Sequence, residues 1–203
     1  MILAVWSDKG GTGKTTLACS LAWALEAPLV DLDPQGDASR WAGKASYPCT
    51  APGGEVEIRE LVASKANSRD LVVLDCPPGH DQRALLGAAT ARLVVIPTRS
   101  GEADVVAFGR GLTVLQSLQA RGNPDMMIGV VLNAYRETAR ARSVQEALQS
   151  KAKEGRFVYL GHLGERIAVE ESYANGKSLL YVGGAASFEA KQIVEKIAAS
   201  KIF

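Results

Sequence analysis

Short apolar runs alternate with longer amphipathic stretches along the whole chain. Most of the short runs are continuously apolar, which predicts strands that are buried on both faces. They span Ile2–Trp6, Pro28–Leu32, Leu71–Asp75, Leu93–Pro97, Met126–Leu132 and Phe157–Leu160. Strands separated by helical patterns are typical of βαβ units. We therefore expect an α/β fold with a doubly wound, mostly parallel sheet that carries helices on both faces.

Apolar positions at helical spacing predict the helices between these strands. The clearest stripe starts near Ala103 and contains Val105, Phe108, Leu112 and Leu115. The predicted helices span Lys14–Glu26, Glu57–Ala66, Gln82–Thr90, Ala103–Arg121, Ala139–Lys153, Arg166–Asn175 and Ala186–Lys201. Prolines and paired glycines make Ala42–Gly54 the least regular stretch, and it predicts a loop with one edge strand.

Composition adds a few limits to this picture. The chain has 203 residues, of which 47% are hydrophobic, so residues 1–203 are expected to form a single domain. A net charge of +1 excludes a globally basic nucleic-acid binder but permits a local basic patch. The three cysteines show no metal-ligand or disulfide spacing, and no apolar run approaches membrane-spanning length. We expect a cytoplasmic protein.

A glycine-rich loop between the first strand and the first helix carries the candidate chemistry. It reads Lys9-Gly10-Gly11-Thr12-Gly13-Lys14-Thr15-Thr16. Its glycines would let backbone N–H groups face an anion, and the helix N-terminus adds the positive end of its dipole. Lys14 would reach the β- and γ-phosphates, and the Thr15 hydroxyl would be a ligand of Mg²⁺. The loop departs from the strict phosphate-loop pattern, because Asp8 stands where that pattern has its first glycine.

This loop resembles the deviant Walker motif of the ParA/MinD family of P-loop ATPases. Two more segments extend the resemblance in the expected order: Asp31-Leu32-Asp33-Pro34-Gln35-Gly36 is similar to the family's switch I, and Leu71–Gly79 is similar to its Walker B strand and switch II. Weaker similarity extends the resemblance over nearly the whole chain. The likeness is greatest to the small ParA-type DNA partition ATPases and implies a Rossmann-like P-loop fold with ATP and Mg²⁺ as cofactors.

The resemblance also implies a role for each matching residue. Lys9 corresponds to the signature lysine, which contacts the phosphates in the partner subunit, so that ATP is sandwiched in a homodimer. Lys14 and Lys9 would offset charge during phosphoryl transfer. Asp33 would orient the attacking water and Asp31 would support the shell of the metal, while Asp75 would hold Mg²⁺ through water.

The nucleotide base is less well specified by the sequence. The guanine-reading NKxD motif is missing. By resemblance, Asn133 matches the position where the family contacts adenine with an amide side chain. The loop expected at Gly161–Gly164 lacks the proline that the family often places against adenine. ATP is favoured over GTP, mainly by the resemblance.

Two surfaces distinguish the branches of the family. Arg136, Arg140 and Arg142 form the best basic cluster, and in a helix Arg136 and Arg140 would share a face. The cluster is either a patch for non-specific DNA or a solvated helix start. The apolar stripe of the last helix is interpreted as packing against the sheet rather than as a MinD-type membrane helix, because its charges are mixed. No stable membrane insertion is expected.

The remaining conspicuous residues are predicted to have structural rather than catalytic roles. His80 and His162 are interpreted as loop histidines, and the tryptophans as core or helix-packing residues. Cys76 is read as a small buried filler. Asp8 would add negative charge beside the phosphate loop unless it points away or pairs with an arginine.

The leading hypothesis is a partition ATPase for plasmid or chromosomal DNA. In this hypothesis an ATP-bound dimer coats DNA in the nucleoid, and a centromere-binding, ParB-like partner stimulates hydrolysis. A MinD-like membrane-associated ATPase that positions division or other cargo is the alternative. A P-loop ligase or metal-delivery chaperone is a third possibility, and the scattered cysteines disfavour metal delivery.

Overall fold

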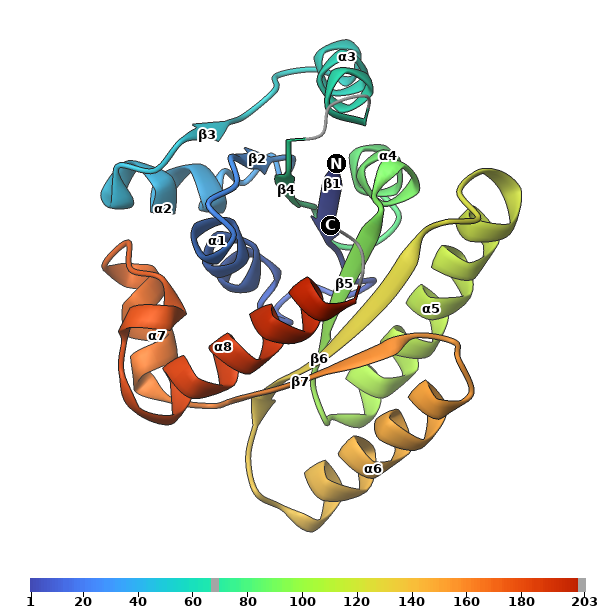
Figure 1. The fold of residues 1–203 in the computed structure, drawn as a ribbon, viewed down its shortest axis with the longest axis vertical. Helices are drawn as coiled ribbons and strands as arrows, with labels where there is room; N and C mark the ends of the chain where they lie inside the picture. The colour runs from blue at the N-terminus through green and yellow to red at the C-terminus, as the bar shows by residue number, and fades with distance from the viewer. Residues whose placement is uncertain (67–69, 201–203) are drawn as a thin grey trace.

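Seven parallel strands form the sheet at the centre of the protein (Figure 1). A computed structural model describes residues 1–66 and 70–200. The strand order is β3-β2-β4-β1-β5-β6-β7. The strands are β1 (Ile2–Val5), β2 (Leu29–Asp31), β3 (Cys49–Thr50), β4 (Val72–Asp75), β5 (Leu93–Thr98), β6 (Met127–Tyr135) and β7 (Val158–Gly164). The order reverses around β1, which places the loop after β1 at a topological switch point, where open α/β sheets bind ligands.

Helices cover both faces of this sheet (Figure 1). They are α1 (Lys14–Ala24), α2 (Asp37–Ala45), α3 (Glu55–Ala66), α4 (Gln82–Thr90), α5 (Glu102–Gly122), α6 (Ala139–Lys153), α7 (Ile167–Ala174) and α8 (Gly184–Ala199). A short 3₁₀ helix, η1, spans Leu179–Tyr181. The described chain is thus a single α/β domain with a doubly wound parallel sheet, as the alternating pattern predicts.

Two hydrophobic cores fill the spaces between the sheet and its helices. In β1, Ile2 and Ala4 face a core with α3–α6, while Leu3 and Val5 face the other core with α1, α2 and α8. Side chains of a strand alternate between the faces of the sheet, so a strand that is apolar on both faces must be covered on both. The continuous apolar runs of the sequence have this physical origin.

The structure corrects two of the local expectations. Helix α2 (Asp37–Ala45) is not among the predicted helices, and its last residues fall in the stretch expected to be a loop. Within that stretch the predicted edge strand is confirmed, because β3 pairs with β2. His162 lies inside β7 rather than in a loop. The end of the last predicted helix, at Lys201, lies outside the described residues.

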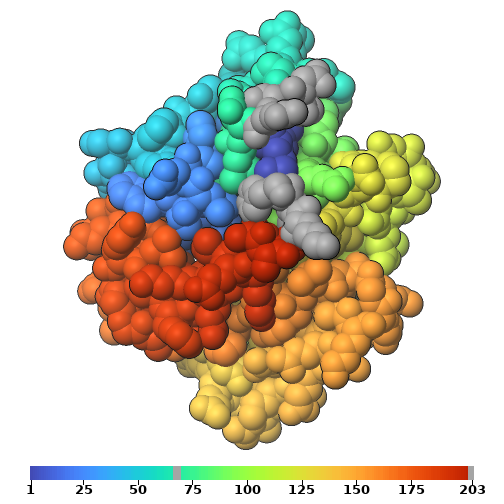
Figure 2. Space-filling view, viewed as in Figure 1, coloured from blue at the N-terminus to red at the C-terminus, as the bar shows by residue number. Residues whose placement is uncertain are grey.

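Helix α8 packs against the sheet, as its apolar stripe predicts. Ile193 and Ile197 are fully buried in the core that α8 shares with α1 and β7. Figure 2 shows α8 covering this face of the molecule, beside the surface of α1. No helix among residues 1–66 and 70–200 is long and apolar enough to cross a membrane.

Candidate nucleotide site

The loop between β1 and α1 has the backbone shape of an anion cradle. Gly11 and Gly13 have φ angles of 72° and 92°, which side chains rarely adopt, and Gly13 is the residue that precedes the first turn of α1. A Cβ atom at Gly13 would also collide with the amide nitrogen of Asn133, which donates a 2.7 Å hydrogen bond to the carbonyl of Thr12. The free N–H groups of the α1 N-terminus therefore face the cradle without a capping side chain.

Internal hydrogen bonds hold this loop in place. The Ser7 hydroxyl lies 2.8 Å from the Thr12 hydroxyl and donates to the Lys9 carbonyl at 2.9 Å. Lys14 is only 7% exposed, and its ammonium lies 3.5 Å from the same carbonyl. Burial lowers the pKa of Lys14, although Asp75 and Asp33 oppose the shift. A buried ammonium beside free backbone N–H groups is suited to binding phosphate.

Asp75 lies at the end of β4, beneath the cradle, and is fully buried. Neither of its carboxylate oxygens makes a hydrogen bond of good geometry within the described chain, although the Thr15 hydroxyl is close enough to affect its ionisation. Burial raises the pKa of Asp75 to about 8, and the nearby Asp31 adds to the shift. A buried, unpartnered carboxylate beside a threonine hydroxyl fits Mg²⁺, which binds through one or two oxygen ligands and retains waters. Thr15 and Asp75 are the residues that would hold the metal.

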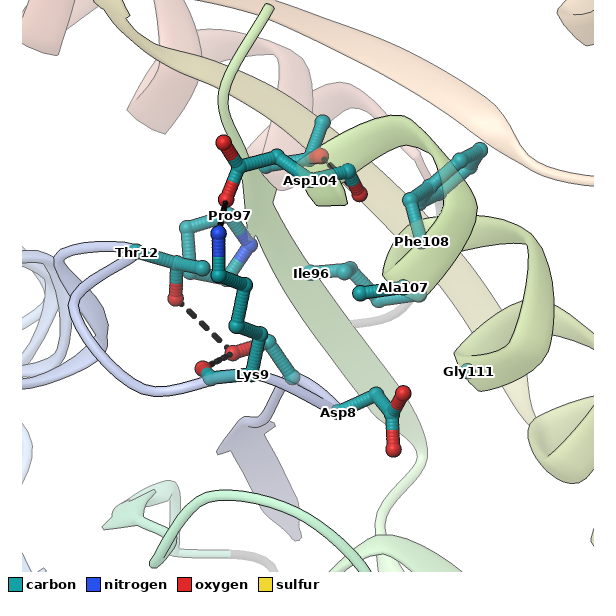
Figure 3. A pocket seen from close by; sticks show the side chains of 11 residues that line it. Asp8, Lys9, Thr12, Ile96, Pro97, Asp104, Ala107, Phe108 and Gly111 are labelled. Carbon is teal, nitrogen blue, oxygen red and sulfur yellow. Dashed lines mark hydrogen bonds and ion pairs between the residues drawn. The ribbon is translucent and has the colours of Figure 1, made fainter. Parts of the chain in front are cut away.

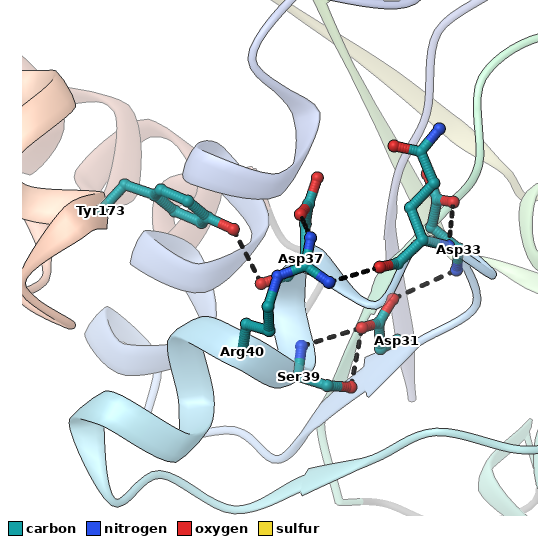
Figure 4. Close-up of polar contacts among 7 residues, drawn as sticks. Asp31, Asp33, Asp37, Ser39, Arg40 and Tyr173 are labelled. Atoms are coloured by element: carbon teal, nitrogen blue, oxygen red, sulfur yellow. Dashed lines mark hydrogen bonds and ion pairs between the residues drawn. The ribbon is translucent and has the colours of Figure 1, made fainter.

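Asp31 lies opposite Asp75 in the register of β2 and β4. Asp33 follows just after β2, close to Asp31 (Figure 4). Both oxygens of Asp31 are occupied: Oδ2 accepts from the Ser39 N–H at 2.8 Å and from the Ser39 hydroxyl at 2.7 Å, and Oδ1 accepts from the Asp33 N–H at 3.1 Å. Asp31 therefore anchors the first turn of α2. Asp33 is less buried than Asp31. Its Oδ1 accepts a hydrogen bond from the Gln35 N–H, and its other oxygen accepts none within the described chain. Of the two, Asp33 is the better placed to contact a water.

A cavity of about 260 Å³ opens beside the cradle. It is lined by Gly11, Gly13, Thr16, Arg99, Asn133, Ala134, Gly164, Glu165, Arg166, Val169 and Glu170. Glu189 of α8 braces one wall, because it accepts hydrogen bonds from the Gly164 N–H and from both terminal nitrogens of Arg166. The cavity therefore continues from the phosphate loop to Asn133, where the sequence predicts the nucleotide base.

The two residues before the glycine pair, Asp8 and Lys9, both contact α5 (Figure 3). Asp8 lies 2.9 Å from the Nε of Arg110 and 2.9 Å from the Nε2 of His80. Of the two alternatives that the sequence leaves open for Asp8, the structure shows the pairing with an arginine. Lys9 points to Asp104 at 2.6 Å. His80 is exposed, as expected, but it has a partner.

The arginine cluster is arranged differently from the prediction. Arg136 precedes α6, so it does not share a helix face with Arg140. Each arginine has an acidic neighbour: Arg136 forms a two-pronged pair with Glu165, Arg140 lies 4.0 Å from Glu102, and Arg142 lies 3.6 Å from Glu137. Arg140 also donates to the Ser100 carbonyl. The cluster is exposed, but its charge is largely balanced.

Several residues around the loop have no local signal in the sequence. Asp104, Arg110 and Glu189 reach the site from distant helices, and ordinary helix periodicity does not mark them. Arg99 and Glu165 follow the ends of β5 and β7, where side chains of a parallel sheet reach the ligand edge. Arg99 comes shortly after the predicted strand Leu93–Pro97, which is a signal in the sequence, whereas Glu165 lies beyond the loop expected at Gly161–Gly164.

Comparison with known proteins gives the family. Residues 3–180 match the family described as the CobQ/CobB/MinD/ParA nucleotide binding domain. The chain belongs to this family. As a member of the CobQ/CobB/MinD/ParA family, it carries a nucleotide-binding domain across most of its length.

Several known proteins are similar to this chain over most of its length. The maintenance of carboxysome distribution protein A of Halothiobacillus neapolitanus is 28% identical over 200 residues, which cover 87% of this chain and 89% of the relative. The chromosome-partitioning ATPase Soj of Thermus thermophilus is 27% identical over 218 residues, covering 87% and 86%. The solved ATP complex of a Cyanothece McdA variant superposes with a TM-score of 0.78 at 18% identity, over 98% of this chain and 96% of that one, and shows a common fold.

Proposed function

We propose that this protein is a Mg²⁺-dependent ATPase that dimerises around ATP, binds DNA non-specifically in that state and is reset by hydrolysis. The buried, unpartnered carboxylate of Asp75 beneath a preformed phosphate loop is the observation that carries the proposal. The loop supplies backbone N–H groups and Lys14 for the phosphates, and Asp75 with Thr15 supplies oxygen ligands for the metal. ATP is the nucleotide we propose, with Asn133 at the base end of the cavity.

The hydrolytic step follows from the same residues. Bound Mg²⁺ would offset charge on the phosphates. Lys14 stabilises charge that develops on the transferred phosphoryl group. Asp33, whose second oxygen accepts no hydrogen bond from residues 1–66 or 70–200, orients the attacking water. Lys9 supplies a second cation to the site of the other protomer.

The role in the cell that we propose is partition of plasmid or chromosomal DNA, with a ParB-like protein as the stimulating partner. The similarity to the chromosome-partitioning ATPase Soj supports this role. The similarity to a protein named for carboxysome distribution favours a second candidate, in which the same ATP switch distributes a protein cargo. The partition role would place the protein in the cytoplasm, associated with the nucleoid.

DNA binding with nucleotide is the experiment that tests the proposal. Binding to duplex DNA without sequence preference is measured with ATP, with ADP and without nucleotide, across salt concentration. ATP should give binding whose logarithm falls with log salt by about 0.9 for each phosphate neutralised. Binding to liposomes but not to DNA would instead support a membrane-associated, MinD-like role.

Substitution of the three arginines tests where DNA binds. Arg136, Arg140 and Arg142 are replaced together by Ala, and the matched control replaces Arg59, Arg92 and Arg121, which lie on other elements. The first variant should bind DNA more weakly with a flatter salt slope, while the control keeps the slope of the wild type. Equal slopes in both variants would move the DNA site to another surface.

Two further variants separate the steps of the cycle. Lys14→Ala should lose nucleotide binding, because a phosphate ligand disappears. Asp33→Ala should retain ATP and accumulate the dimer, because the water is no longer oriented. Equal loss of nucleotide binding in both variants contradicts these roles.

A further inference from the structure

Lys9 is held by a carboxylate of its own chain. Its ammonium lies 2.6 Å from Oδ1 of Asp104, in the first turn of α5 (Figure 3). The Lys9 side chain is 42% exposed, whereas that of Asp104 is only 13% exposed. Among the residues that the structure describes, Asp104 is the acidic partner of Lys9, and Lys9 is the cationic partner of Asp104.

The carboxylate is fixed from its other side. Oδ2 of Asp104 packs so closely on Gly101 that a Cβ atom there would lie 2.5 Å from it. The Asp104 N–H donates to the Gly101 carbonyl at 3.1 Å, and the helix N-terminus favours negative charge at this position. Asp104 thus presents one oxygen to Lys9 from a constrained position.

The backbone of Lys9 is also fixed, but its side chain is not. The Lys9 carbonyl accepts from the Ser7 hydroxyl, as part of the bonds that shape the loop. The long aliphatic stem leaves the ammonium free to exchange one partner for another by rotation of side-chain dihedrals alone. A change of partner therefore needs no rearrangement of the phosphate loop.

We propose that Asp104 is a positioning residue that holds Lys9 in the nucleotide-free protomer and sets how readily the ATP-bound dimer forms. This inference rests on the proposed function, in which Lys9 crosses to the partner's phosphates. Lys9 has to leave Asp104 to do so, and each protomer then leaves a largely buried carboxylate without its cation. The ATP dimer must offset both losses, so Asp104 opposes premature dimerisation.

Sedimentation velocity with Mg²⁺ and a non-hydrolysable ATP analogue tests this role. Each half-exposed ion pair contributes a factor of about 2 to 5, and two break per dimer, so Asp104→Asn should tighten the dimer by about 4- to 25-fold. Asp104→Glu, which keeps the carboxylate, should remain near the wild type. Glu102→Gln is the matched control, because Glu102 is on the same turn and 87% exposed. Nucleotide affinity of the protomer should be equal in all four proteins.

A second variant and a second readout make the test independent of one substitution. Gly101→Ala keeps every charge but displaces the Asp104 carboxylate, and it should also tighten the dimer. In the absence of nucleotide, acetylation of Lys9, followed by mass spectrometry, should be several-fold faster in Asp104→Asn than in the wild type or Glu102→Gln.

The outcomes distinguish this inference from the function on which it rests. A wild-type protein that dimerises with the analogue, together with an Asp104→Asn variant that dimerises equally or more weakly, overturns the role of Asp104 alone. Unchanged acetylation of Lys9 in that variant also overturns it. A wild-type protein that forms no dimer overturns both the inference and the proposed function.

Discussion

Asp31 and Asp75 lie opposite each other in the register of the neighbouring strands β2 and β4. The two carboxylates have opposite surroundings, because Asp31 accepts three hydrogen bonds and Asp75 makes none of good geometry within the described chain. One aspartate therefore stabilises the fold, while the other is a buried acid whose oxygens are available to a metal ion. Replacement of Asp31 and replacement of Asp75 should therefore have different effects on stability.

Replacement of Asp75 should change how stability depends on pH. Burial raises the pKa of Asp75 in the folded protein to about 8, whereas an unfolded chain releases this proton near pH ~4. Between these values the folded state binds a proton that the unfolded state has lost, so the free energy of unfolding falls as pH rises. Asp75→Asn should flatten this fall and, at pH 8, raise Tm by about 2–4 °C, which corresponds to about 1 kcal/mol.

Thermal unfolding between pH 5 and pH 8.5, without nucleotide or metal, measures this effect. The same variant should gain less stability than the wild type from Mg²⁺ with an ATP analogue, because the carboxylate ligand is gone. A variant that is less stable than the wild type at pH 8, or that has the same slope, contradicts the assignment of Asp75 as an uncompensated buried acid.

Alanine substitutions at two glycines of the phosphate loop would separate the cost of a strained backbone from the cost of a steric clash. Gly11 and Gly13 both have positive φ angles, but a Cβ at Gly11 would meet nothing within 4 Å, whereas at Gly13 it would collide with Asn133. Gly11→Ala should cost about 1–2 kcal/mol from the left-handed backbone alone. Gly13→Ala should cost more than Gly11→Ala and should also weaken nucleotide binding.

The double variant Gly13→Ala with Asn133→Ala supplies the control for this comparison. Removal of the Asn133 amide should recover part of the stability lost in Gly13→Ala, measured by urea unfolding. If Gly11→Ala and Gly13→Ala cost the same, the contact between Gly13 and Asn133 does not constrain the loop.

The layered fold and the phosphate loop were predictable because their causes are local. Continuous apolar runs require strands covered on both faces, and the glycines before Lys14 mark the tight turn after β1. Helix α2 was missed for the opposite reason. Its apolar positions, Ala38, Trp41, Ala42 and Ala45, follow helical spacing but over only nine residues, and its first turn is anchored by Asp31 through Ser39, a contact between separate elements. No periodicity within Asp37–Ala45 encodes that contact.

The contacts around the phosphate loop could not be predicted, because they also join residues that are far apart in the sequence. Asp8 meets Arg110, and Lys9 meets Asp104, across about a hundred residues of sequence. The packing of α5 against the residues that follow β1, where Gly111 lies against Trp6 and Asp8, brings these charges together. The arginine cluster could be found in the sequence, but its charge balance could not. The sequence shows Arg136 and Arg140, but it does not show that Glu165 and Glu102 lie beside them in the fold.

Loss of Asp8 should destabilise the protein by a modest amount. Its carboxylate is 8% exposed and has two partners, Arg110 and His80, which are themselves more than half exposed. These partners recover hydration when the carboxylate is removed, so Asp8→Ala should cost only about 1 kcal/mol. The cost should decrease at high salt.

Urea unfolding at low and high salt measures this cost. Asp125→Ala is the matched control, because Asp125 pairs with Arg92 while remaining 81% exposed, and it should cost less than about 0.5 kcal/mol. Equal costs for the two variants would show that the contacts of Asp8 contribute no more than an ordinary surface pair.

Glu189 should support both stability and the cavity. Burial alone would raise the pKa of Glu189, but hydrogen bonds from Arg166 and from the Gly164 N–H more than offset it, so the pKa is lowered. The stability that this carboxylate contributes is present above its unfolded pKa of about 4.3 and is lost as pH falls below it. Glu189→Gln should cost about 1–2 kcal/mol at pH 7, because a neutral amide cannot accept from all these donors.

Two measurements on the Glu189→Gln variant separate its effects. Thermal unfolding should show a Tm lower by about 2–4 °C per kcal/mol and a smaller loss of stability on acidification than in the wild type. Nucleotide affinity should fall as well, because Gly164 and Arg166 line the cavity beside the phosphate loop. A variant that loses stability but keeps the nucleotide affinity of the wild type would place the base of the nucleotide elsewhere, away from the wall that Glu189 braces.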